Sequence, residues 1–132
     1  MPTIFFAIFC LLHAMVHMLY AGQSSRIFEL KPGLVWPDGS WAFSRLLGDE
    51  TTRLLATVFL VLAALGFAAG GLGLFVHQGW WRPVIVGAAA FSTLLYLLFW
   101  DGSFQAWDAR GGIGILINLA VLVVVLVVKW PS

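Results

Sequence analysis

The chain has 132 residues, of which 61% are hydrophobic and only 10% are charged, and its formal net charge is +1. A soluble domain keeps about a quarter of its residues charged, so this composition indicates an integral membrane protein, with the lipid bilayer as its first partner. The near-neutral charge and the lack of a basic run argue against nucleic-acid binding, and the single cysteine excludes an internal disulfide.

Four apolar segments are long enough to cross a bilayer, which takes roughly 20 residues. They cover residues 3–21, 51–76, 83–100 and 112–129. Backbone polar groups find no partner in lipid, so each segment is expected to be helical. The first segment lacks the positively charged lead-in of a secretory signal, and we interpret it as a retained helix. The sequence predicts one all-α integral membrane domain over the whole chain, a four-transmembrane-helix bundle built as two helix hairpins.

The longest connection, residues 22–48, contains the turn sequence Trp36-Pro37-Asp38-Gly39 and then an aromatic-rich run that ends at Gly48. This pattern predicts a structured, partly helical loop at the membrane surface. An even number of crossings places both termini on one face and the connections 22–48 and 101–110 on the other. The Lys/Arg count slightly favours the cytoplasm for the loop face, although that face is net negative.

Two histidines stand inside the first apolar segment. Cys10, His13, His17 and Tyr20 recur at steps of three and four, so they share one face of a helix. An ionisable side chain at membrane depth is costly and normally points into the bundle or into a wet cavity. We therefore expect this face of the helix to point inward.

The other three segments each offer a polar side chain at a comparable depth, when a rise of about 1.5 Å per residue is counted from the loop face. These side chains are Thr57, Tyr96 and Asn118. Acids and a tryptophan would form the rim of the same region. The sequence thus predicts a polar pocket in the loop-side half of the bundle, with the ligand-binding residues His13, His17, Tyr20, Glu50, Tyr96, Trp100, Asp101 and Asn118.

Two functions fit such a pocket, and a third would do without one. The favoured one is binding or permeation of a small solute, a proton or a hydrophobic ligand. A membrane-embedded enzyme for a lipophilic substrate is an alternative, and it would need a carboxylate, Asp101 or Glu50, within hydrogen-bond reach of a histidine. An accessory subunit of a larger membrane complex is the third, and it would need no cavity.

Two further interpretations concern the histidines themselves. His13 and His17 lie at i and i+4 and could reach one metal ion, with Cys10 as a soft third ligand suited to zinc or copper, although no second His or Cys cluster completes the site. Alternatively, the histidines could hydrogen-bond Asn118, Tyr96 or a carbonyl and hold the helices together.

Small residues mark two of the segments. Gly66, Gly70 and Gly73 form a stripe in residues 51–76, and residues 87–90 read Gly-Ala-Ala-Ala. Such faces let helix backbones approach closely, so these two helices are expected to pack on each other. A homodimer, or a partner membrane subunit on the same stripe, stays open. The overall pattern resembles small bacterial four-helix membrane proteins, which implies a bacterial inner or plasma membrane.

Overall fold

The structure, a computed structural model, describes residues 2–102 and 111–131. Its helices are α1 (Pro2–Ser24), α2 (Ser44–Phe75), α3 (Trp81–Leu98) and α4 (Gly112–Leu122), and α4 continues into a π-helical segment, η2 (Val123–Val128). No strand occurs in the described residues. The all-helical class expected from the sequence is confirmed.

Three of these helices, α1, α2 and α3, are long and apolar enough to cross a membrane. The fourth apolar element, Gly112–Val128, is shorter. The predicted spans 3–21, 83–100 and 112–129 agree with the helix bounds within about three residues. Of the connection 101–110, residues 103–110 lie outside the described part of the chain.

The second helix contains a break near its start. α2 runs from Ser44 to Phe75, but the backbone of Gly48 is not helical (φ 79°, ψ 162°), so a short helical piece and a long one meet there. Glycine adopts a positive φ without a Cβ clash. The break agrees with the predicted partly helical loop that ends at Gly48 and with the separate span predicted from residue 51.

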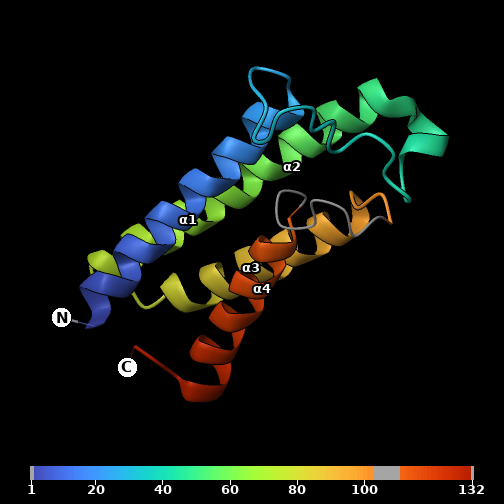
Figure 1. Cartoon of the computed structure of the whole chain (residues 1–132). Helices are drawn as coiled ribbons and strands as arrows, with labels where there is room; N and C mark the ends of the chain where they lie inside the picture. Colours follow the sequence, from blue (N-terminus) through green and yellow to red (C-terminus); the bar gives the residue numbers. More distant parts are fainter. Residues whose placement is uncertain (1, 103–110, 132) are drawn as a thin grey trace.

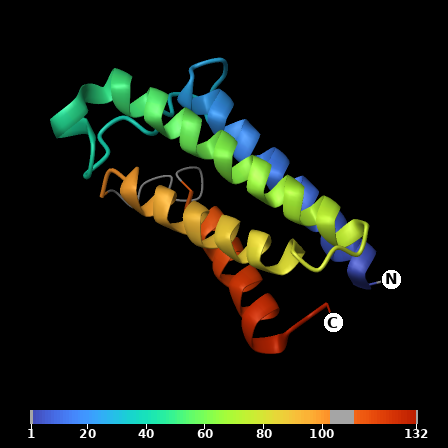
Figure 2. The same ribbon diagram turned by 180° about the vertical axis from the view of Figure 1, so that it is seen from behind.

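Elements that are neighbours in sequence pack on each other: α1 on α2, α2 on α3, and α3 on α4. Figures 1 and 2 show α1 and α2 side by side, with α4 crossing α3 at an angle and diverging from the other helices toward its C-terminal end. A Cβ added at Gly66 would lie 2.9 Å from Cβ of Ala88, which confirms the predicted close packing of the small-residue faces of α2 and α3. This stripe of α2 is therefore occupied within the chain.

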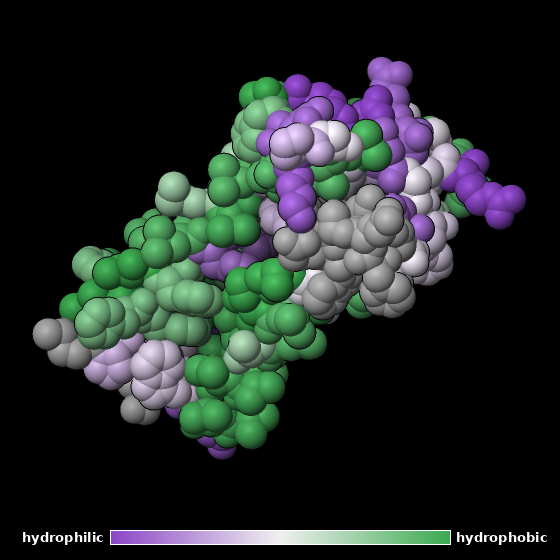
Figure 3. Space-filling model, in the orientation of Figure 1, coloured by the Kyte–Doolittle hydropathy of each residue, from purple (hydrophilic) through white to green (hydrophobic). Residues whose placement is uncertain are grey.

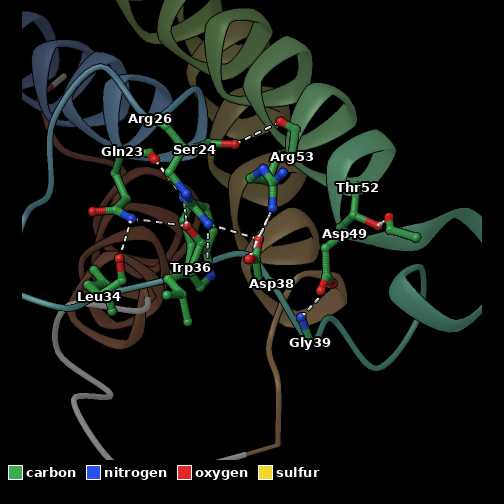
Figure 4. Close-up of polar contacts among 12 residues, drawn as sticks. Gln23, Ser24, Arg26, Leu34, Trp36, Asp38, Gly39, Asp49, Thr52 and Arg53 are labelled. Carbon is green, nitrogen blue, oxygen red and sulfur yellow. Dashed lines mark hydrogen bonds and ion pairs between the residues drawn. The ribbon is translucent and has the colours of Figure 1, made fainter.

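The loop between α1 and α2 folds back over the end of the helices through a set of polar contacts (Figure 4). Gln23, which is fully buried, donates to the carbonyls of Leu34 and Trp36 and accepts from the amide of Leu30. The carboxylate of Asp38 accepts hydrogen bonds from Arg26 and Arg53, at 2.8 and 2.9 Å. The loop is structured, as predicted, and it is fixed to both α1 and α2.

The same loop also reaches the end of α3. The Ser40 hydroxyl donates to the carbonyl of Leu98 at 2.6 Å, and the Trp41 indole N–H donates to the carbonyl of Leu97 at 2.6 Å. The last carbonyls of a helix have no partner inside the helix. The loop therefore satisfies two of them and closes the loop-side end of α3.

Candidate functional site

Both histidines of α1 are buried, as the spacing predicted. His13 is 3% exposed and His17 is fully buried, and Cys10 and Tyr20 on the same face are buried as well. The face points toward α2, α3 and α4, because its rings contact Phe67 of α2 and Tyr96 of α3 and its polar atoms reach α3 and α4.

The two imidazoles take part in a chain of short hydrogen bonds that joins three helices. Nε2 of His13 lies 2.8 Å from Oδ1 of Asn118 in α4, and Nδ2 of Asn118 lies 2.8 Å from Oγ of Ser92 in α3. Oγ of Ser92 lies 2.5 Å from Nε2 of His17, whose Nδ1 is 2.8 Å from the carbonyl oxygen of His13. We call His13, His17, Ser92 and Asn118 the histidine network.

The directions of the bonds in the histidine network follow from its carbonyl acceptors and from neutral imidazoles. A carbonyl oxygen only accepts, so His17 donates through Nδ1–H to the main chain of His13, and His13 donates through Nε2–H to Asn118. Asn118 then donates to Ser92, and the Ser92 hydroxyl donates to the remaining ring nitrogen of His17. The hydrogen bonds thus run from the ring of His13 through Asn118, Ser92 and His17 back to the main chain of His13, with both imidazoles neutral. A network without net charge suits a low-dielectric interior.

Aromatic rings enclose the histidine network. The ring of Phe67 lies 4.6 Å from that of His13 and 5.1 Å from that of His17, between ring centroids. Tyr96 lies 5.8 Å from His17 on the loop side and also contacts Tyr20 and Trp36. The structure thus brings together five predicted residues, His13, His17, Tyr20, Tyr96 and Asn118.

Other predicted site residues lie elsewhere. Glu50 is exposed and lines a separate hollow of about 250 Å³ with Ser24, Arg53 and Thr57. The hydroxyl of Thr57 bonds to Ser24 and to the carbonyl of Arg53, so Thr57 does not face the histidines. Trp100 and Asp101 are half-buried at the loop-side end of α3, whereas the bonds of His13 and His17 described above go to Asn118, Ser92 and the main chain.

The predicted structural partners of the histidines are confirmed in part. His13 bonds to Asn118 and His17 bonds to a carbonyl, but the buried hydroxyl of Tyr96 has no hydrogen-bond partner within residues 2–102 and 111–131. Ser92 was missed by sequence reasoning. It lies four residues before Tyr96 and so on the same helix face, but no other feature of the sequence distinguishes it from its neighbour Thr93, which also carries a hydroxyl.

The donors needed for a metal ion are not grouped here. Within residues 2–102 and 111–131, no set of three or more His, Cys, Asp or Glu side chains could hold an ion. Both nitrogens of His17 and Nε2 of His13 are already bonded to protein atoms. The predicted set of His13, His17 and Cys10 therefore receives no support from the geometry.

An apolar groove lies on the other side of His13 from the loops. Its volume is about 480 Å³, and α1 and α4 do not pack closely where it runs. We call it the α1–α4 groove; it is lined by Phe5, Phe6, Phe9, Ile117, Ala120, Val121, Val124 and Trp130.

The α1–α4 groove ends next to the histidine network. The ring of Phe9, which lines the groove, is stacked on the ring of His13 at 5.9 Å and an interplanar angle of 9°. Ile117 and Val121 flank Asn118 in α4. Figure 3 shows a small hydrophilic area between the hydrophobic surfaces of α1 and α4. The groove thus ends at the ring of Phe9, and the buried His13 lies directly behind that ring.

Comparison with known proteins finds no match to this chain among protein-family models, curated proteins or solved structures.

Proposed function

We propose that this chain is a small integral membrane protein that crosses the bilayer four times, as two helix hairpins, and binds one hydrophobic ligand in the α1–α4 groove. In this proposal α4 and η2 form the fourth crossing. Their 11 and 6 residues together rise about 26 Å at 1.5 Å per residue, close to the roughly 30 Å of a hydrocarbon core.

The α1–α4 groove is the observation that carries the proposal. Sites for small ligands are concave, have volumes of about 300–1,000 Å³ and are lined by apolar and aromatic side chains with a few polar groups. The groove has about 480 Å³, four aromatic side chains in its lining and His13 behind Phe9. It lies between apolar helices, where hydrocarbon chains are the surrounding medium, so a ligand with a single hydrocarbon chain fits its chemistry.

The histidine network supports the same proposal by fixing the position of α4. Ser92 and Asn118 hold α3 and α4 together, and His13 ties α4 to α1. Below this level α4 and η2 diverge from α1, and the segment after η2 turns back so that the ring of Trp130 meets that of Phe6 at 5.4 Å between centroids; the groove lies between them. The network therefore acts as the fixed upper end of a groove whose walls are two different helices.

Two alternatives have weaker support. An enzyme of the kind considered above would need a carboxylate bonded to a histidine, whereas both histidines bond to Asn118, Ser92 and the main chain. An accessory subunit would need no cavity, whereas a groove of ligand size is present. Binding is the function that uses the observed geometry.

A photoreactive fatty acid bound to the purified full chain in nanodiscs tests the proposal. We expect saturable labelling of the groove residues on α1 and α4, which an excess of unlabelled fatty acid removes. Ala120→Phe should fill the groove and reduce labelling at least several-fold, because Ala120 lines it. The matched control is Leu119→Phe, which adds a ring on the exposed side of the same helix.

The labelling experiment contradicts the proposal if the label spreads evenly over the exposed faces of α2 and α3. Equal labelling of Ala120→Phe and Leu119→Phe would also contradict the proposal.

The four crossings are tested by a separate experiment. Cysteine introduced as Pro32→Cys, in a chain with Cys10→Ser, should react with a membrane-impermeant reagent from one side only, while tags at both termini are reached from the opposite side.

A further inference from the structure

The start of α3 and the end of η2 are joined by one arginine. Nη1 of Arg82 donates to the carbonyl of Val125 at 2.9 Å, and Nη2 donates to the carbonyl of Pro131 at 3.1 Å. The guanidinium also lies over the ring of Trp81, 4.7 Å from its centroid. Two of the five N–H groups of the guanidinium are used in this way, and the others have no acceptor among the described residues.

Arg82 has a second cation beside it. Lys129 follows η2 directly, is exposed, and lines with Arg82 a hollow of about 420 Å³ whose remaining walls are Val125 and Leu126. The hollow therefore has two positive side chains at its edge and an apolar floor.

Among the residues that the structure describes, no acidic side chain lies at this end of the molecule. The basic or titratable side chains there are His77, Arg82 and Lys129, and the acids of the described residues belong to the loop segments and the adjoining helix ends on the opposite side. The ion pairs of Asp38 also lie on that opposite side. Within the described residues, Arg82 and Lys129 have no carboxylate partner.

We propose that the hollow between Arg82 and Lys129 binds the phosphate of an anionic phospholipid headgroup, with an acyl chain lying along Val125 and Leu126. Arginine and lysine are the side chains that bind phosphate, and basic pockets between membrane helices bind anionic headgroups. The position at the ends of two apolar helices places the hollow at headgroup level, and the apolar floor suits a lipid better than a free anion. This site lies apart from the α1–α4 groove and needs no ligand there, but it rests on the proposed crossing of the bilayer by α4 and η2.

Native mass spectrometry of the full chain, released from nanodiscs with phosphatidylglycerol or phosphatidylcholine, tests this site. We expect retained phosphatidylglycerol, and a loss of about fivefold in its affinity for Lys129→Gln, the effect of one basic side chain near an anionic surface. Lys129→Arg should retain the lipid. Arg45→Gln is the control, because it removes one exposed positive charge at the opposite end.

Three outcomes of this experiment would overturn the proposal. Equal retention of the two lipids would show that the headgroup charge is not recognised. An equal loss in Lys129→Gln and Arg45→Gln would show an effect of net charge alone. Displacement of phosphatidylglycerol by millimolar inorganic phosphate, which then binds as tightly, would identify a site for a free anion and not for a lipid. Lys129 is exposed, so its substitution leaves the buried contacts of η2 in place and the result can be interpreted.

Discussion

Ser92→Ala removes one oxygen atom and should weaken the histidine network by breaking two of its hydrogen bonds. Ser92 accepts a hydrogen bond from Asn118 and donates one to His17. Hydrogen bonds between membrane helices contribute about 0.6 kcal/mol on average and about 1.7 kcal/mol at most, so the loss of two lowers the free energy of unfolding by about 1.2 to 3.4 kcal/mol. The upper half of the range applies because the variant leaves a ring nitrogen and an amide N–H buried without their partner.

Thr93→Val is the matched control for Ser92→Ala. The Thr93 hydroxyl donates only to the carbonyl of Ala89 within α3, at 2.8 Å, so its loss should change stability by less than about 0.5 kcal/mol. Steric trapping in bicelles measures both free energies of unfolding. A Ser92→Ala variant as stable as Thr93→Val would refute the connection of α1, α3 and α4 through this hydroxyl. A double-mutant cycle with Asn118→Leu should give a coupling energy within the same range.

Three further predictions concern the loop and the helix packing. Gln23→Leu removes three hydrogen bonds to the loop main chain, so proteolysis within residues 25–43 should become at least tenfold faster, while Gln78→Leu at an exposed turn should leave it unchanged. Asp38→Asn removes two partly exposed ion pairs worth about 0.2–1 kcal/mol each, so it should accelerate proteolysis less than Gln23→Leu does. The effect should shrink in high salt. Faster proteolysis of Asp38→Asn than of Gln23→Leu would contradict the conclusion that Gln23 holds the loop more strongly than Asp38. Gly71→Ala should destabilise the chain, because its Cβ would lie 3.1 Å from the main-chain oxygen of Ala7. Gly87→Ala meets nothing within 4 Å and should stabilise α3 by up to about 1 kcal/mol. Thermal unfolding in detergent compares the two variants, and equal shifts in melting temperature would contradict the packing of α1 on α2.

The helices and their buried faces follow from local patterns that a sequence displays. Apolar length predicts the spans, and the spacing of His13 and His17 predicts the face that turns inward. Asn118 was predicted as a partner because depth can be counted along a helix, and the structure bears this out. These inferences need only the regular geometry of one helix at a time.

The features that sequence reasoning missed depend on how the helices cross. Ser92 and Thr93 are alike in sequence, and only the rotation of α3 against α1 decides which hydroxyl meets His17. Gln23 bonds to the main chain of the loop between α1 and α2, and the path of that loop is set by the loop's own turns. The α1–α4 groove exists because α4 diverges from α1, an angle that hydropathy does not encode.

The occupant of the α1–α4 groove is tested most directly by nuclear Overhauser effects between a protonated fatty acid and the methyl groups of an otherwise deuterated chain in deuterated detergent. We predict cross-peaks from the fatty-acid chain to Ala120 and Val124, which line the groove, and none above background to Leu119 or Val58, which are exposed but lie outside it. Cross-peaks of equal strength at all four positions would contradict a bound ligand and show only a lipid-covered surface.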